Sequence, residues 1–189
     1  LEGAGKSTAI SIVKNWLKKK GIATITTREP GGTPVAEKLR AIVKAKDDTD
    51  PLLPLSELLL MYAARVQLVN NVIKPALKQG IWVVGDRHEL STKAYQGGGR
   101  GIPLKQLETL HTLCLEDFKP DLTLYLDIPP SLGFERIKNR QYIDRIEQES
   151  LDFFERVRVI YHACVNEKEK IIQIDASQEL KKVHADIVM

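Results

Sequence analysis

A glycine-rich turn at the start of the chain limits most strongly what the protein can fold into. Residues 2–7 read Glu-Gly-Ala-Gly-Lys-Ser and match the end of the phosphate-binding motif G-x-x-x-x-G-K-[ST], with its first glycine falling before Leu1. In this motif glycines let backbone N–H groups converge on phosphate oxygens, and the next helix points its positive end at them. The motif joins a β-strand to an α-helix, so the sequence predicts an α/β fold.

Two side chains of this turn have defined chemical tasks in the motif. The ammonium of Lys6 reaches the β- and γ-phosphates of a nucleotide, and the hydroxyl of Ser7 binds Mg²⁺. The alternative is a plain glycine turn ahead of a helix, which the Gly-Lys-Ser run beside a helical pattern disfavours. The sequence therefore predicts a nucleotide site formed by Glu2, Gly3, Ala4, Gly5, Lys6, Ser7 and Thr8.

Apolar periodicity divides the rest of the chain into alternating helices and strands. Strands are expected at 22–27, 81–84, 122–126 and 171–174, and helices at 8–20, 34–45, 55–78, 103–116, 131–140 and 149–168. The glycine-rich residues 97–101 are expected to form a flexible loop. This alternation favours a parallel sheet with helices on both faces. Because the motif normally follows a strand, we expect the first strand to precede Leu1 and further residues to follow the other end.

The composition agrees with one soluble globular domain over residues 1–189. Hydrophobic residues make up 43%, and 28 basic against 25 acidic residues leave a net charge of +3. That excess is too small to predict binding to nucleic acid or a membrane surface, and no apolar run reaches the ~20 residues that span a bilayer. Cys114 and Cys164 lack a metal-site spacing, so buried thiols in a reducing, cytoplasmic compartment are expected.

Charged side chains follow three of the expected strands. Arg28, Asp86 and Asp127 each come where a strand ends, and ligands of parallel sheets gather at the carboxyl ends of the strands. No N-K-x-D segment, typical of guanine-reading switch proteins, occurs, and Asp86 is followed by Arg87 rather than by the glutamate of hydrolytic motors. Cations suit a site that joins two phosphorylated molecules, because the repulsion between them must be neutralised. The candidate cations are Arg28, Arg40, Arg65, Arg87, Arg136, Arg140 and Arg145.

Longer segments of the chain resemble the bacterial thymidylate kinase family. The most specific are T-R-E-P-G-G-T at 27–33, G-D-R-H at 85–88 and S-T-K-A-Y-Q-G at 91–97. The resemblance covers nearly the whole chain in the family's order, with further matches at 1–7, 62–65, 120–126 and 144–145. It implies a three-layer P-loop nucleoside monophosphate kinase fold, a homodimer, and Mg²⁺-dependent transfer of a phosphate from ATP to dTMP, giving dTDP.

The resemblance also implies substrate contacts. It assigns Glu2 to the 3′-hydroxyl of the acceptor sugar, Arg87 to the phosphates of both nucleotides, and Asp86 to the support of Mg²⁺. It places Arg65 at the thymine edge and Tyr95 under the deoxyribose, although Tyr95 could instead be a core aromatic. The remaining acceptor contacts that it implies are Arg28, Arg40, Ser91, Thr92 and Gln96.

Some members of the family carry an arginine in the phosphate loop, where this chain has Gly3. The other type supplies that charge from a mobile lid, which the resemblance places at about 134–146. Arg136 and Arg140 are the expected ATP contacts there, while Lys138 could equally belong to a basic helix face. A lid arginine neutralises transition-state charge and excludes water, so Lys6, Arg87 and Arg140 are the predicted catalytic residues.

One position departs from the family's pattern. Where the family usually has a phenylalanine that stacks on thymine, this chain has Met61, which could pack on a base or fill the core. A kinase for another nucleoside monophosphate, such as dUMP, therefore stays an alternative, as does a nucleotide-binding switch that transfers no phosphate. The apolar helix around 55–73 is a candidate dimer face, or part of the core.

Overall fold

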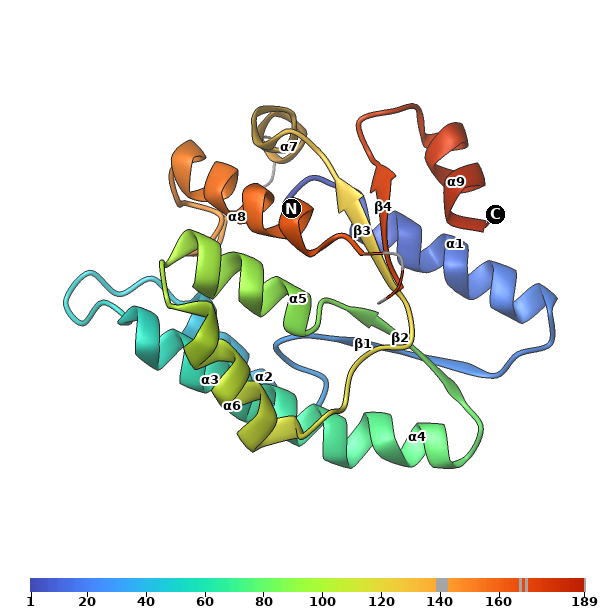
Figure 1. Ribbon diagram of the computed structural model, residues 1–189, viewed down its shortest axis with the longest axis horizontal. Coiled ribbons are helices and arrows are strands. Elements are labelled where there is room, and N and C mark those ends of the chain that lie inside the picture. The colour runs from blue at the N-terminus through green and yellow to red at the C-terminus, as the bar shows by residue number, and fades with distance from the viewer. Residues whose placement is uncertain (139–142, 167, 169, 189) are drawn as a thin grey trace.

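Helices and strands alternate along the chain in the computed structural model, which describes residues 1–138, 143–166, 168 and 170–188. Figure 1 shows short parallel strands in the middle of the molecule and helices around them. The elements are α1 (Lys6–Lys19), β1 (Thr24–Arg28), α2 (Pro34–Lys44), α3 (Pro54–Leu68), η1 (Val69–Ile73), α4 (Lys74–Lys78), β2 (Trp82–Asp86), α5 (Glu89–Thr92), η2 (Lys93–Gly99), α6 (Leu104–Leu115), β3 (Thr123–Asp127), α7 (Pro130–Ile137), α8 (Leu151–Cys164), β4 (Ile171–Asp175) and α9 (Leu180–Val188).

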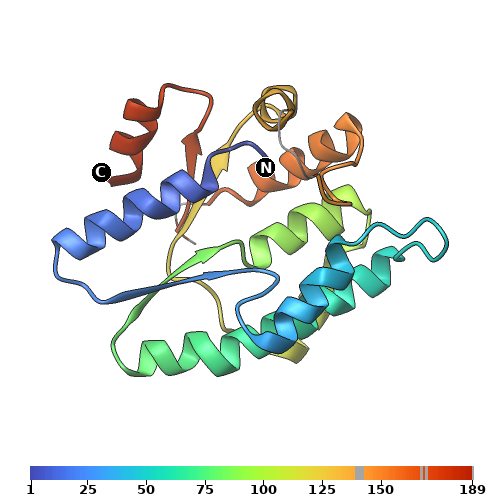
Figure 2. The same ribbon diagram turned by 180° about the vertical axis from the view of Figure 1, so that it is seen from behind.

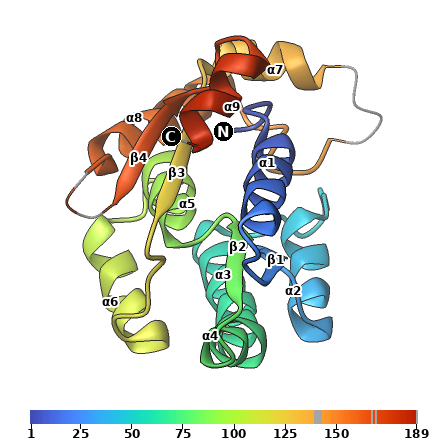
Figure 3. The ribbon, with the colours of Figure 1, turned by 90° about the vertical axis from the view of Figure 1, so that its right-hand side faces the viewer.

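The strands form two parallel pairs. Strand β1 pairs with β2 so that Arg28 lies opposite Asp86, and β3 pairs with β4 so that Asp127 lies opposite Asp175. Within the described residues these are separate two-stranded sheets, where we expected one sheet. Figure 3 shows α1 and α9 on one side of the strands and α5, α6 and α8 on the other. An α/β architecture of parallel strands and helices is thus confirmed.

The long helix expected at 55–78 is one continuous rod with a change of winding in its middle. Helix α3 passes through the π-helical turn η1 into α4, and Pro75 lies in the first turn of α4. A proline in a helix interior lacks a backbone donor and clashes with the preceding turn, and a π-turn accommodates both effects. Figure 2 shows this rod from behind, with the loop between α2 and α3 extending beyond the body of the molecule.

The expectation of a flexible loop at 97–101 is wrong. Residues 97–99 belong to the π-helical segment η2. Gly97 and Gly99 are buried, and η2 packs against α8. A Cβ on Gly99 would lie 2.4 Å from the ring of Phe153, and one on Gly98 would lie 2.7 Å from Ile160. The glycines therefore serve close helix packing, which sequence alone cannot distinguish from flexibility.

The main core connects the phosphate loop to α8. It contains an aromatic group formed by Tyr95, Tyr125, Phe153, Phe154 and Tyr161, in which Tyr125 and Tyr161 stack with ring centroids 4.6 Å apart. Large buried rings of this kind contribute much of a small domain's hydrophobic stabilisation. None of the helices in the described ranges combines the length and apolar character needed to cross a membrane.

Candidate active site

A cleft of about 410 Å³ opens where the phosphate loop meets the carboxyl ends of β1 and β2. Its walls also come from α2, α3, η2, α7 and the segment after residue 143. Most of the predicted site residues gather here, which follows from the parallel arrangement of the strands. Those that line the cleft are Glu2, Gly3, Gly5, Lys6, Ser7, Thr8, Arg28, Arg40, Met61, Asp86, Arg87, Ser91, Tyr95, Gln96 and Arg136.

The phosphate loop has the backbone geometry that its glycines predict. Gly3 and Gly5 have φ values of 72° and 82°, in the left-handed region that suits glycine. A Cβ on Gly3 would lie 2.4 Å from the carbonyl oxygen of Gly133 in α7, so no side chain fits there. The structure therefore leaves no room for an arginine at this position of the loop, and any such charge must come from another element.

The side chain of Lys6 turns back over the loop. Its Nζ donates a hydrogen bond to the carbonyl oxygen of Leu1 at 2.9 Å and lies 3.7 Å from Oε2 of Glu2. These contacts hold a cation above the left-handed turn and at the start of α1, where the helix dipole is positive. A phosphate bound there would meet both the ammonium and converging backbone donors.

Glu2, Arg87 and Tyr95 line the cleft as one connected group. Nη2 of Arg87 donates to Oε1 of Glu2 and to the hydroxyl of Tyr95 at 3.2 Å, and the guanidinium lies 4.7 Å from the ring centroid of Tyr95. Burial alone would raise the pKa of Glu2, but Arg87 and Lys6 hold it well below its usual value. A charged carboxylate and a guanidinium are thus fixed against each other beside the phosphate loop.

Ser7 and Asp86 carry oxygen atoms and line the cleft near the phosphate loop. The Ser7 hydroxyl is exposed at the start of α1, while Oδ1 of Asp86 is buried in the cleft wall with no hydrogen-bond partner among the described residues. An unpartnered buried carboxylate oxygen is costly unless something binds it. Mg²⁺ takes few protein ligands, mostly carboxylate or hydroxyl oxygens, and completes its shell with water and phosphate, so this pair fits the ion.

Two further arginines line the side of the cleft formed by β1 and α2. Arg40 donates from Nη1 to the carbonyl oxygen of Pro30 at 2.7 Å, and Arg28 bonds Oε2 of Glu37 at 2.9 Å. Burial, together with the nearby Arg28, lowers the pKa of Arg40. An anion placed between the two arginines would relieve this repulsion, which makes this wall suitable for a second phosphate.

Arg65 lies behind the cleft rather than on its surface. Its side chain is 1% exposed, and its three nitrogens bond to Glu29 at 2.7 Å, Glu89 at 2.9 Å and Thr92 at 2.7 Å. Burial works against its charge, but the two carboxylates raise the pKa of Arg65. Thr92 is fully buried beside it, so neither of these two predicted base contacts lines the cleft. Ala4 of the phosphate loop is likewise buried in the core.

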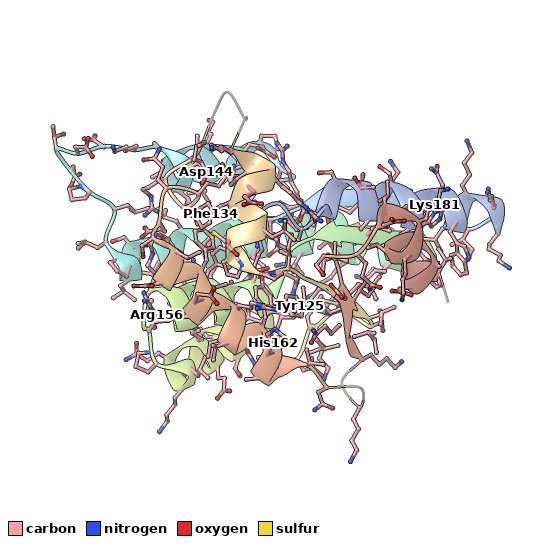
Figure 4. The ribbon with its side chains drawn as sticks, turned by 90° about the horizontal axis from the view of Figure 1, so that it is seen from above. Tyr125, Phe134, Asp144, Arg156, His162 and Lys181 are labelled. Atoms are coloured by element: carbon pink, nitrogen blue, oxygen red, sulfur yellow. The ribbon has the colours of Figure 1, made fainter. Side chains whose placement is uncertain are left out.

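The expected lid at 134–146 is anchored at both of its described ends. Arg136 of α7 donates to the carbonyl oxygens of Gly3 at 3.4 Å and Ala176 at 2.9 Å. On the other side, Asp144 binds Nζ of Lys44 in α2 at 2.6 Å. Figure 4 labels Phe134 and Asp144, which mark these two ends. Lys138 is exposed and does not line the cleft, and Arg140 lies outside the described residues.

Asp127 was expected at the ligand-binding edge of the sheet, but its carboxylate is held elsewhere. It accepts two hydrogen bonds from Arg158 at 2.9 Å and one from Tyr125 at 2.7 Å, and lies 3.2 Å from Nε2 of His162. Burial raises the pKa of Asp127, but the contacts with Arg158 and Tyr125 outweigh this effect and lower the pKa to about 2. Figure 4 shows Tyr125 and His162 close together, away from the labelled end of the lid.

Some residues that line the cleft were not singled out from the sequence. They include Glu29, Lys44, Asp144 and Glu147. Glu29 and Asp144 lie within segments that carry the family resemblance, so that pattern could have identified them. Nothing in the sequence marks Lys44, because its place in the wall depends on the packing of α2 against the segment that contains Asp144.

The chain is similar to known thymidylate kinases. A family model described as thymidylate kinase matches residues 1–187. The thymidylate kinases of Shewanella sp. (strain MR-4) and Shewanella sp. (strain ANA-3) are both 56% identical over 189 residues, which cover 100% of this chain and 90% of theirs. The thymidylate kinase of Shewanella frigidimarina (strain NCIMB 400) is 56% identical over 188 residues, covering 99% of this chain and 87% of its own.

Proposed function

This chain belongs to the thymidylate kinase family, and from that premise we propose that it transfers the γ-phosphate of ATP to dTMP, giving dTDP, across the cleft described above. The observation that carries the proposal is that cations from separate elements line one cleft. Lys6 comes from the start of α1, Arg28 and Arg40 come from β1 and α2, and Arg87 directly follows β2. Two polyanions held end to end need such cations more than they need a base, because the acceptor phosphate is already nucleophilic.

For the donor side, we infer that ATP lies on the phosphate loop with its phosphates at Lys6 and the start of α1. Ser7 and Asp86 would hold Mg²⁺, which supplies charge neutralisation for the transferring phosphate when it is bound. The family generally uses this ion, and the unpartnered Oδ1 of Asp86 supports its placement. Arg136 lines the same end of the cleft and is available to the donor nucleotide.

For the acceptor side, we propose that the dTMP phosphate meets Arg28, Arg40 and Arg87. The deoxyribose would then pack on Tyr95, with its 3′-hydroxyl at Glu2, which is already fixed against Arg87 and Tyr95. The list of proposed base contacts comprises Met61, Arg65, Ser91, Thr92 and Gln96. Arg65 has five N–H donors, and its three hydrogen bonds to Glu29, Glu89 and Thr92 use three of them.

The lid completes the proposed mechanism. Because Gly3 leaves no room for a side chain, the transition-state cation of this chain is proposed to be Arg140 of the lid. We expect Arg140→Ala to lower kcat by about 10²–10³ while changing the KM for dTMP much less, since a group that acts in the transition state adds little to substrate binding. Steady-state kinetics of the variant would measure this, and an unchanged kcat would remove Arg140 from the mechanism.

We also propose the finer architecture and assembly that the family implies. The fold would be a three-layer P-loop nucleoside monophosphate kinase domain over residues 1–189, with the lid as its moving part. The homodimer would form on the outer face of α3, where Leu55 and Leu59 are 58% and 51% exposed. Large apolar side chains grouped on one exposed helix face favour burial against a partner.

The experiment that tests the function measures ADP formation from ATP with each of several acceptors. A dTMP kinase shows ADP formation that depends on added dTMP, and a higher kcat/KM for dTMP than for dCMP. A preference for dCMP would contradict the proposed acceptor. ADP formation that does not depend on added dTMP would instead favour a nucleotide-binding switch. Comparing dTMP with dUMP tests the kinase alternative that Met61 leaves open.

A further inference from the structure

The amide of Gln96 is held in one orientation at the acceptor end of the cleft. Gln96 is 1% exposed, and its Nε2 donates to Oε1 of Glu57 at 2.7 Å. Its Oε1 is buried and has no hydrogen-bond partner among the described residues. A buried acceptor without a partner costs free energy, and Gln96 lines the cleft, so the N–H group of a ligand bound there can satisfy this oxygen.

Glu57 can stabilise only this orientation, because it is held as an anion. Its Oε2 accepts a hydrogen bond from Nη2 of Arg100 at 3.0 Å and another from Nη2 of Arg145. Burial raises the pKa of Glu57, but Arg100, Arg145 and Gln96 together lower it below its usual value. An ionised carboxylate accepts hydrogen bonds and donates none, so it binds the NH₂ group of Gln96. In the reversed orientation, Oε1 of Gln96 would face Oε1 of Glu57, and two acceptors cannot form a hydrogen bond with each other.

We propose that Glu57 is a positioning residue which fixes the amide of Gln96 with its oxygen toward the cleft, and thereby selects a nucleobase that offers an N–H donor there. This inference rests on the proposed function, in which the acceptor base lies at this end of the cleft. Thymine and uracil carry an N–H between their two carbonyl groups, whereas cytosine has an unprotonated acceptor nitrogen at that ring position. Cytosine would leave two acceptors facing each other, without a hydrogen bond between them.

The test compares kcat/KM for dTMP with kcat/KM for dCMP in the wild-type protein and in Glu57→Gln. An amide at position 57 can donate as well as accept, so Gln96 can turn and offer its NH₂ group to cytosine. We expect the ratio of dTMP to dCMP activity to fall at least about tenfold. The ratio is measured within one preparation, so a smaller fraction of folded enzyme does not change it.

Two further variants separate the amide from the ion pairs. Glu149→Gln removes the other acidic partner of Arg100 without touching Gln96, and it should keep the wild-type ratio. Glu57→Asp keeps the charge for both arginines but withdraws the carboxylate from Gln96, so its ratio should fall even if Glu57→Gln does not fold.

Two outcomes would overturn the proposal about Glu57. In one, both variants at position 57 keep the wild-type ratio; in the other, Glu149→Gln lowers the ratio as much as they do. A wild-type protein without dTMP-dependent ADP formation would instead overturn the proposed function, so the two failures are distinguishable.

Discussion

Arg87 has a backbone conformation that few residues other than glycine adopt. Its φ is 71°, directly after β2, and this strained turn directs the guanidinium at Glu2 and Tyr95. Non-glycine residues in this region cost free energy and concentrate at functional sites. Although burial opposes its charge, the contacts with Tyr95 and Glu2 raise the pKa of Arg87, so it remains a cation at any physiological pH.

From this geometry we expect Arg87→Ala to lower kcat by about 10²–10³ and to raise the KM for dTMP, because one guanidinium serves both the ground state and the transition state. Steady-state kinetics with dTMP as the varied substrate measures both effects. The matched control is Arg158→Ala, whose arginine binds Asp127 outside the cleft and should leave kcat unchanged. Wild-type kinetics in Arg87→Ala would rule out its placement between the two nucleotides.

His88 adds a pH dependence to stability. Its side chain is largely buried, with Nε2 3.7 Å from Oε1 of Glu29, and burial, followed by the nearby Arg65 and His111, lowers the pKa of His88 to about 3. The unfolded chain binds a proton with the ordinary pKa of about 6.5, so His88 stabilises the fold fully above that pH. Between about pH 6.5 and 3 His88 is protonated in the unfolded state but not in the folded state. The free energy of unfolding therefore falls as the pH decreases.

The prediction is that urea unfolding between pH 6.5 and 4 has a shallower pH dependence in His88→Gln than in the wild type. The difference in slope should approach one proton, about 1.4 kcal/mol per pH unit. His184→Gln serves as the control, because that histidine lies on α9 far along the chain from this buried cluster and should keep the wild-type slope. Equal slopes in all three proteins would show that His88 does not contribute.

At the scale of elements, the packing of η2 against α8 depends on the absence of side chains at Gly98 and Gly99. A Cβ on Gly99 would lie 2.4 Å from two carbon atoms of the Phe153 ring, which is itself buried in the main core. We expect Gly99→Ala to destabilise the protein by about 1–3 kcal/mol, because the ring or one of the helices must move. Chemical denaturation measures the change in the free energy of unfolding.

Gly85→Ala in β2 is the matched control for this prediction. Its φ is not positive, and the nearest atom to an added Cβ is Oγ1 of Thr27 at 3.6 Å, an ordinary contact. Removing a glycine there restricts the unfolded chain, so stability should stay the same or increase slightly. A Gly99→Ala variant as stable as Gly85→Ala would contradict the steric argument.

The elements themselves were largely predictable, because their signals are local. The β-branched run 24–27 forms β1, and Gly21, with a φ of 71°, ends α1 as a residue without Cβ can. Residues 97–101 were not predictable, since a glycine run has the same composition whether it is a mobile loop or a packed helix. The packed helix at these residues depends on the contact with Phe153, which lies more than 50 positions further along the chain.

At the scale of the whole molecule, the proposed homodimer can be tested on the exposed face of α3. We expect Leu59→Arg to shift the protein from dimer to monomer in sedimentation equilibrium, because a buried charge without a partner opposes association. Val159→Arg on α8 is the control, since Val159 is 64% exposed on another helix. A wild-type monomer at all concentrations, or a dimer in both variants, would contradict an interface on α3.

Local chemistry can be read from the amino-acid sequence of this protein: the phosphate loop, the strand ends that carry Arg28 and Asp86, and membership of its family, because each depends on residues close together along the chain. Which charges meet depends on the packing of distant elements. Glu29 and Glu89 hold Arg65 behind the cleft wall across 36 and 24 positions.

Glu57 likewise bonds to Gln96 across 39 positions, and to two arginines further along the chain. The physical reason is that backbone conformation follows from neighbouring residues, whereas the partner of a buried charge follows from how whole helices pack. That packing is set by the shape and burial of many side chains together, so no short pattern records it.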